Sequence, residues 1–203
     1  TQPTGVPSSE ALRVVLFGMP DAGKSSLLGA LAQAAQTQER ILQGRLLDIT
    51  PGMEELRRRV YEDRTRETLE EIVPHPITFE PFQGTAPPDP VTIVIYDCDG
   101  RVANELLTRR KSFDRDATRG SLAQAVLDAD ALVLVIDASA SPEQIDADFR
   151  EFTRFLDFLR EHRTLDRKVG GLPVFLALSK CDLLAREGDS AEGWTFRVND
   201  RKE

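Results

Sequence analysis

The chain of 203 residues has little of what marks several other classes of protein. It contains only two cysteines, Cys98 and Cys181, and they form no C-x-x-C pair, which favours reduced thiols over a disulfide framework. No apolar run approaches the roughly 18 residues that a membrane span requires, and no signal peptide is visible. We therefore expect a cytoplasmic protein with no direct membrane span.

Acidic residues outnumber basic ones. The sequence has 26 lysines and arginines against 34 acidic residues, for a net charge of -8, which argues against a general nucleic-acid or anionic-membrane surface. The two histidines, His75 and His162, are isolated, so we assign neither to a metal site nor to catalysis. Lysine is rare, and two of its positions fall within the motifs described below: Lys24 and Lys180.

The length suits one domain with a sizeable core. Residues 1–10 are rich in Pro, Gly and Ser and are predicted to be a linker, and residues 11–184 form the domain. Residues 185–203 are a polar tail or the start of a further C-terminal element that is cut short. Because the first residue is Thr, we expect the chain to be a piece of a longer protein.

A glycine-rich stretch follows the first predicted strand. Residues 12–17 are a short β-rich run, residues 18–25 fit the pattern G-x-x-x-x-G-K-[ST], and residues 25–35 have a helical pattern. In such a loop, backbone N–H groups close around phosphate oxygens, and the start of the helix adds positive charge. Lys24 would reach the β- and γ-phosphates, and the Ser25 hydroxyl would bind Mg²⁺. The alternative is an ordinary turn between a strand and a helix.

A carboxylate ends the apolar run of residues 91–96, in Asp97-Cys98-Asp99-Gly100. Asp97 could hold Mg²⁺ through a bound water, and Gly100 could supply a backbone N–H that moves when a γ-phosphate leaves. An Asp-Gly turn after a strand is common, so this motif is weak by itself. Its position after the glycine-rich loop favours the nucleotide-binding interpretation.

A second carboxylate follows the apolar residues 173–178, in Ser179-Lys180-Cys181-Asp182. Asp182 could accept hydrogen bonds from N1–H and N2–H₂ of guanine together, a pair of donors that adenine lacks on that edge. Lys180 would lay its aliphatic stem beside the base and sugar. The alternative is a solvated turn after a strand.

Apolar strands alternate with helices along the chain, which predicts a mostly parallel sheet with helices on both faces. Residues 50–51, Thr-Pro, are predicted to start a charged helix, with the Thr50 hydroxyl as its cap and Pro51 at the first helical position. Residues 74–76, Pro-His-Pro, are predicted to be an extended linker. The expected strands are 12–17, 77–82, 91–96, 131–138 and 173–179, with 77–82 and 91–96 as a hairpin and the last two buried; the expected helices are 25–35, 52–72, 121–130 and 142–162. All three motifs would then meet at the carboxyl ends of strands.

At residues 18–25, 97–100 and 179–182 the chain resembles the Ras-like and translation-factor class of P-loop GTPases, over roughly residues 11–184. The resemblance implies an α/β, three-layer P-loop NTPase fold with one antiparallel hairpin strand. It implies GTP or GDP with Mg²⁺. A threonine in the first switch would also bind Mg²⁺, only when GTP is present; Thr78 is the candidate and Thr50 the alternative. The implied nucleotide-binding residues are Gly18, Asp21, Ala22, Gly23, Lys24, Ser25, Ser26, Ser179, Lys180 and Asp182; the metal-binding ones are Ser25, Thr78 and Asp97; the catalytic ones are Lys24, Thr78 and Gly100.

The chain departs from this family pattern at three points. Arg101 stands where many members carry the Gln that orients the attacking water, so slow hydrolysis is expected. Asp21 occupies the position of the cation-binding Asn of bacterial GTPases that use K⁺, although an acidic loop tip facing water is the alternative. The fifth motif of the family is not found after Asp182.

The sequence thus predicts a guanine-nucleotide switch domain of a larger bacterial protein. The chain is also loosely similar to the G domains that are embedded in large bacterial proteins, including a component of type VI secretion. The rival is a pseudo-GTPase scaffold that binds nucleotide without hydrolysis; an ATP-dependent enzyme is disfavoured by Asp182. A protein effector or activator would bind the switch regions and the helix within residues 51–73. Residues 101–119 carry six basic side chains and would form a partner-facing surface or supply an arginine finger.

Overall fold

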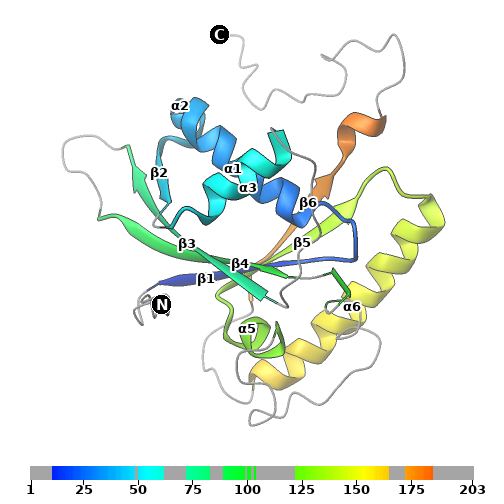
Figure 1. The fold of residues 1–203 in the computed structure, drawn as a ribbon. Helices are drawn as coiled ribbons and strands as arrows, with labels where there is room; N and C mark the ends of the chain where they lie inside the picture. Colours follow the sequence, from blue (N-terminus) through cyan, green and yellow to red (C-terminus); the bar gives the residue numbers. More distant parts are fainter. Residues whose placement is uncertain are drawn as a thin grey trace, which may run out of the picture.

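The computed structural model describes residues 11–48, 50–61, 72–82, 89–98, 100–101, 103, 122–164 and 172–184. Within them a six-stranded sheet has the order β2-β3-β4-β1-β5-β6 (Figure 1). Its strands are β1 (Leu12–Phe17), β2 (Gly44–Asp48), β3 (Ile72–Pro81), β4 (Val91–Cys98), β5 (Ala131–Asp137) and β6 (Val174–Ser179). The motifs at residues 18–25, 97–100 and 179–182 each follow or end one of these strands.

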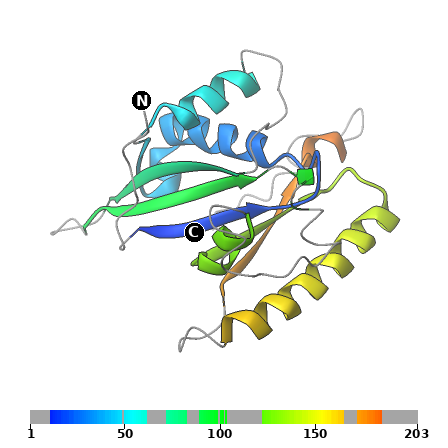
Figure 2. The same ribbon diagram turned by 60° about the horizontal axis from the view of Figure 1, so that its bottom comes forward.

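Helices cover both faces of the sheet. Figure 2 shows two helices, α1 (Lys24–Thr37) and α3 (Gly52–Tyr61), on one face, and two others, α5 (Leu122–Asp128) and α6 (Pro142–Thr164), on the opposite face. The short helices α2 (Glu39–Leu42) and η1 (Cys181–Leu184) flank these layers. The predicted three-layer α/β fold is confirmed. None of the helices in the described ranges is long and apolar enough to cross a membrane.

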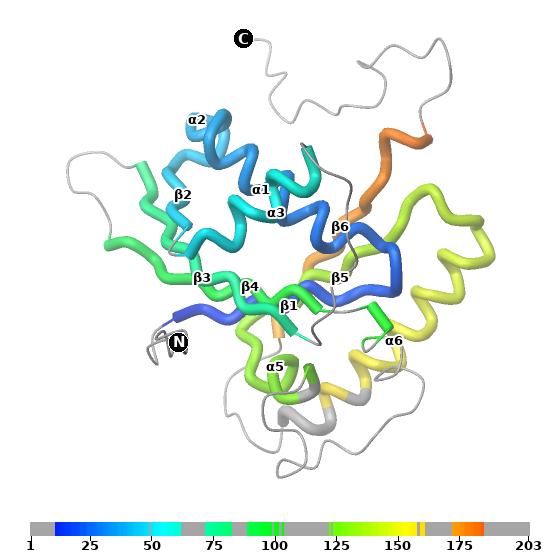
Figure 3. The backbone as a smooth tube through the Cα atoms, in the orientation of Figure 1, coloured from blue at the N-terminus to red at the C-terminus, as the bar shows by residue number. Residues whose placement is uncertain are grey.

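One strand runs against the rest. β1 pairs in parallel with β4 and β5, and β5 pairs in parallel with β6, whereas β3 is antiparallel to both β2 and β4. The carboxyl ends of β1, β4, β5 and β6 therefore share one edge of the sheet, which the backbone trace in Figure 3 lets the reader follow. That edge is where ligands bind in sheets of this type.

The central strand β1 separates two apolar cores. On one face Leu16 packs with Leu28 of α1 and Met53 of α3. On the other, the Phe17 ring stacks on Phe155 of α6, with ring centroids 4.7 Å apart. Because both faces of β1 are buried, its sequence is an apolar run and not an alternating one.

The start of β3 differs from the sequence-based prediction. The helix was predicted to reach residue 72 and residues 74–76 were predicted to be a linker, but Ile72 already belongs to β3, as do Pro74 and Pro76. The described helix ends at Tyr61, and residues 62–71 lie outside the described part. On the side that faces β2, residues 72–76 of β3 have no ladder partner within the described ranges, because β2 pairs only with residues 77–81, and proline is tolerated in a strand with such a free side.

Two further predictions about local structure were wrong or incomplete. Thr50 was expected to cap α3, but the Asp48 carboxylate accepts the hydrogen bonds of the backbone N–H groups of Met53 and Glu54, at 3.0 and 3.3 Å. The strand β2 and the helix α2 were not predicted, because residues 39–48 alternate weakly in polarity.

The last strand was predicted to be buried, and this is wrong for β6. It lies at the edge of the sheet, and Phe175 and Leu176 are 58% and 52% exposed. An apolar run indicates burial in the middle of a sheet, but it does not reveal whether the strand is central or at the edge.

Candidate nucleotide-binding site

The loop of residues 18–23 joins β1 to α1 and lies flat against β5. A β-carbon added at Gly18 would come within 2.5 Å of the Val135 carbonyl oxygen, so only glycine fits there. Gly23, directly before the helix, has φ of 82°, and Asp21 at the exposed tip of the loop has φ of 59°. The left-handed backbone at Gly23 is what glycine adopts without steric cost. The residue pattern therefore encodes a tight turn that leads its backbone N–H groups into the start of α1.

Lys24 bends back over this loop. Its Nζ donates hydrogen bonds to the backbone oxygens of Gly18 and Met19, at 3.0 and 2.9 Å, and the residue is only 6% exposed. A buried ammonium group held by two carbonyl oxygens brings a fixed positive charge to the loop. Together with the N-terminus of α1, it makes the loop a favourable environment for phosphate oxygens.

Ser25 and Asp97 join the first motif to the second. The Ser25 hydroxyl donates a 2.5 Å hydrogen bond to Asp97 Oδ2, across 72 positions of the sequence. Asp97 is 1% exposed, and its Oδ1 has no hydrogen-bond partner within the described ranges. Desolvation raises the pKa of Asp97 against the opposing effects of the Ser25 hydrogen bond and the Lys24 charge.

This arrangement fits a bound magnesium ion. A hydroxyl and a carboxylate are oxygen donors of the kind that Mg²⁺ prefers. Among the described residues, no group pairs with the buried Asp97 Oδ1, although a buried carboxylate oxygen normally has a hydrogen-bond partner. A cation beside Ser25 and Asp97 would compensate for the desolvation that raises the pKa of Asp97.

A histidine that the sequence did not single out lies near Asp97. His75 is 4% exposed on β3, its Nδ1 has no hydrogen-bond partner in the described part of the chain, and desolvation lowers its pKa. The charges of Asp97 and Asp48 oppose this shift. Only the strand register reveals this neighbourhood, since Val73 pairs with Asp97 and His75 with Ile95.

Gly100 packs directly against the loop of residues 18–23, the predicted phosphate-binding loop. A β-carbon at this position would lie 2.5 Å from the backbone nitrogen and Cα of Pro20. The close approach requires glycine, and it brings the end of the second motif onto the first. Of residues 101–119, the structure describes Arg101, which is exposed, and Ala103; the predicted basic partner surface otherwise lies outside the described residues.

The third motif contacts the same loop through Ser179. Its hydroxyl lies 2.6 Å from the carbonyl oxygen of Ala22 and 3.0 Å from that of Ile136. A β-carbon at Gly23 would sit 3.4 Å from the Ser179 side chain. Asp182, three residues further on, is exposed at the start of η1, and Ser26 is exposed on α1. The loop after β6 thus lies beside the phosphate-binding loop.

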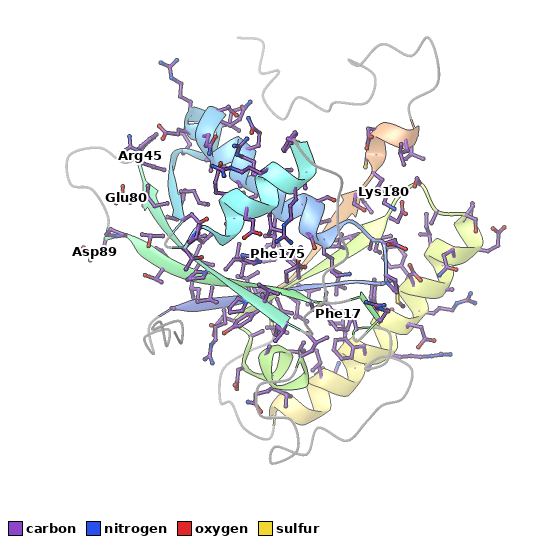
Figure 4. All side chains as sticks on the ribbon, viewed as in Figure 1. Phe17, Arg45, Glu80, Asp89, Phe175 and Lys180 are labelled. Carbon is purple, nitrogen blue, oxygen red and sulfur yellow. The ribbon has the colours of Figure 1, made fainter. Side chains whose placement is uncertain are left out.

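The structure does not bring Thr78 to this group. Thr78 pairs with Thr92, five residues before Asp97 along β4, or about 16 Å at 3.3 Å per residue. Glu80, two residues beyond Thr78, lies at the end of the sheet opposite Lys180 (Figure 4). The sequence placed Thr78 at the start of its strand, but β3 begins six residues earlier and runs away from the site.

These features define the phosphate-binding part of a P-loop nucleotide site. A model of the 50S ribosome-binding GTPase family matches residues 13–166, about three quarters of the chain. The chain belongs to this family of P-loop GTPases. No curated protein and no solved structure matches the chain.

The substitution Asp97→Asn should stabilise the nucleotide-free domain near neutral pH by about 1 kcal/mol, because a buried neutral amide costs less than a buried charge. The raised pKa of Asp97 gives the sign: the folded state favours the protonated carboxyl, so its unfavourable contribution grows as pH rises from the usual range of Asp. Urea denaturation in EDTA at pH 5 and pH 8 measures the effect. The gain should be larger at pH 8, and an equal loss at both values would contradict the assignment.

The substitution Thr78→Ala should leave the Mg²⁺ dependence of GTP-analogue dissociation unchanged within about twofold, because the strand register keeps its hydroxyl far from Asp97. Thr50→Ala is the matched comparison. Dissociation of a fluorescent, non-hydrolysable GTP analogue over a Mg²⁺ titration checks both, because a switch threonine binds Mg²⁺ only when GTP is present. A tenfold shift of the Mg²⁺ midpoint in the Thr78 variant would support the sequence-based assignment of Thr78.

Proposed function

We propose that this domain binds GTP and GDP with Mg²⁺ and hydrolyses GTP slowly, as a switch within a larger bacterial protein. The observation that carries the proposal is the contact between two distant motifs: the Ser179 hydroxyl lies 2.6 Å from the carbonyl oxygen of Ala22. This contact joins the loop that bears Asp182 to the loop that bears Lys24. A nucleoside triphosphate needs these two loops side by side, one for its base and one for its phosphates.

Phosphate binding follows from the loop and from Lys24. Backbone N–H groups of residues 21–25 and the N-terminus of α1 would surround the β-phosphate, and Lys24 Nζ would lie against the β- and γ-phosphate oxygens. Ser25 and Asp97 would hold Mg²⁺, which neutralises negative charge on the phosphates when bound. For water attacking the γ-phosphate in line, Lys24 and the backbone N–H of Gly100 would stabilise the charge that develops on its oxygens.

Selection of guanine is assigned to Asp182, with Lys180 beside the base. The family match ends at residue 166, so it does not cover Asp182. The support is therefore the chemistry of a carboxylate facing two donors, together with the position of Ser179 against the phosphate-binding loop. Asp182 is exposed, as an acceptor for an incoming base must be.

A slow rate is expected because Arg101 follows Gly100. A guanidinium group has only donors, so it cannot accept a hydrogen bond from the attacking water as an amide oxygen does. The same observation favours the second candidate, a scaffold that binds nucleotide without turnover.

We further propose that Asp21 binds K⁺ at the loop tip. We also propose that the protein is cytoplasmic, and that an effector binds α3 and the switch regions.

The substitution Asp182→Asn should change the base preference from guanine to xanthine. The Asn amide can donate to the C2 carbonyl oxygen of xanthine but cannot accept from both guanine donors. GTP binding should weaken by about 100-fold or more while XTP binding improves. Calorimetric titration of GTP, XTP and ATP into both proteins measures this. Equal affinity of the parent chain for ATP and GTP would exclude Asp182 as the reader of the base.

Turnover should be on the order of 10⁻³ s⁻¹ or slower without a partner. Phosphate release in KCl and in NaCl distinguishes the candidates. Acceleration by K⁺ that disappears in Asp21→Ala would support the cation site. The absence of phosphate release in both salts, with GTP still bound, would support the scaffold.

A further inference from the structure

Asp137 lies at the carboxyl end of β5, and both of its carboxylate oxygens are engaged. Oδ1 accepts hydrogen bonds from the backbone N–H of Ser139 at 2.9 Å and from its hydroxyl at 2.6 Å. Oδ2 accepts one from Lys180 Nζ at 2.6 Å. Because a turn of this kind fixes the carboxylate against its own backbone, the second oxygen is directed at Lys180.

Lys180 reaches Asp137 from a special backbone position. Its φ is 55°, in the left-handed region that residues with a β-carbon adopt at a cost of about 1 kcal/mol. Figure 4 shows the side chain at the end of β6. The two side chains are 33% and 23% exposed, so the ion pair is partly shielded from water. A long side chain with many rotamers is thereby restricted to one region.

The ends of β5 and β6 are joined by further contacts. The backbone N–H of Ala138 donates to the Ser179 oxygen at 3.0 Å, and the Ser179 hydroxyl lies 3.0 Å from the Ile136 oxygen. Through its contact with Ala22, the same hydroxyl also meets the phosphate-binding loop. Asp137 therefore belongs to a set of contacts that join the end of β5 to the start of the loop of residues 179–182.

The ionisation state of Asp137 supports a lasting ion pair. Desolvation raises the pKa of Asp137, but the hydrogen bonds from Lys180 and Ser139 outweigh it and leave the pKa below the usual range. The carboxylate is thus charged at neutral pH and pairs with the ammonium group of Lys180.

We propose that Asp137 is a positioning residue for nucleotide binding: its carboxylate holds Lys180 so that the aliphatic stem forms one wall of the base site. This inference rests on the proposed function. Without the Asp137 charge, the Lys180 side chain spreads over several rotamers and bound nucleotide loses that wall. Nucleotide then dissociates faster, whereas the choice between guanine and adenine stays unchanged, because Asp182 makes it.

A double-mutant cycle on the 203-residue chain tests the inference. Asp137→Asn, Lys180→Met and the double variant are compared by the rate at which a fluorescent GDP analogue dissociates in Mg²⁺. Asp137→Asn should accelerate dissociation about fivefold in the parent chain and have almost no effect in the Lys180→Met background, because the two residues act as one unit. The ratio of GTP to ATP affinity should stay the same in Asp137→Asn.

Asp130→Asn is the matched control. Asp130 immediately precedes β5 at the opposite edge of the sheet, where its carboxylate accepts a 2.8 Å hydrogen bond from the Arg13 backbone N–H and lies 3.7 Å from Arg13 Nε. This variant should lower the melting temperature without changing GDP dissociation. Thermal melts of all variants separate loss of stability from loss of binding.

Three results would overturn the inference. Equal acceleration by Asp137→Asn in both backgrounds would show that Asp137 does not act through Lys180. Slower dissociation would show instead that Asp137 competes with the nucleotide for Lys180, and unchanged dissociation that the ion pair does not contribute to binding; either would overturn the inference too. A parent chain that binds no GDP would overturn the proposed function as well, whereas binding without coupling would overturn this inference alone.

Discussion

The site depends on how tightly the loop of residues 18–23 is held by contacts at the carboxyl ends of three strands, β4, β5 and β6. Gly18 lies against the Val135 carbonyl of β5, and the Ser179 side chain at the end of β6 meets the Ala22 carbonyl. Gly100 closes on Pro20 from β4. Because three strands hold one loop, its backbone N–H groups are oriented before any ligand arrives. A preorganised loop loses less entropy when phosphate binds, and this is the main advantage of building the site on a sheet edge.

The same arrangement places costly groups inside the protein. Lys24, His75 and Asp97 are buried polar or charged side chains, each less than 7% exposed. Lys24 is satisfied by two carbonyl oxygens, but His75 Nδ1 and Asp97 Oδ1 have no hydrogen-bond partner among the described residues. A domain selected for stability alone would replace such groups with apolar ones. Buried polar groups at the start of α1 (Lys24), on β3 (His75) and at the end of β4 (Asp97) are what a site that exchanges stability for ligand binding would show.

The sequence predicts this fold well where signals are local and repeated. Strand, glycine-rich loop and helix follow one another at residues 12–35, and the apolar run of β5 is largely buried, as predicted. Sequence-based prediction fails where the local structure depends on a segment that is distant in the sequence. Pro74 and Pro76 were predicted to be a linker, yet they belong to β3, where they pair with β4. They are tolerated there because β2 ends before it reaches them. Thr50 reads as the helix cap, yet Asp48 accepts those hydrogen bonds. Likewise, β6 reads as a central strand but lies at the edge.

The site shows the same limit most clearly at the switch threonine. Since Ile72 pairs with Cys98 and Thr78 with Thr92, the end of β3 that faces Asp97 is its beginning. A hydroxyl that is to approach Asp97 must therefore come from the chain before Ile72 or from a segment packed beside His75. Thr50 meets the second condition, because its Oγ1 and His75 Nδ1 both lie within 3.4 Å of a β-carbon built on Gly52. The sequence also holds Thr65 and Thr68 before β3, in the part outside the described residues. Choosing among threonines required the register of one antiparallel strand, which no local pattern encodes.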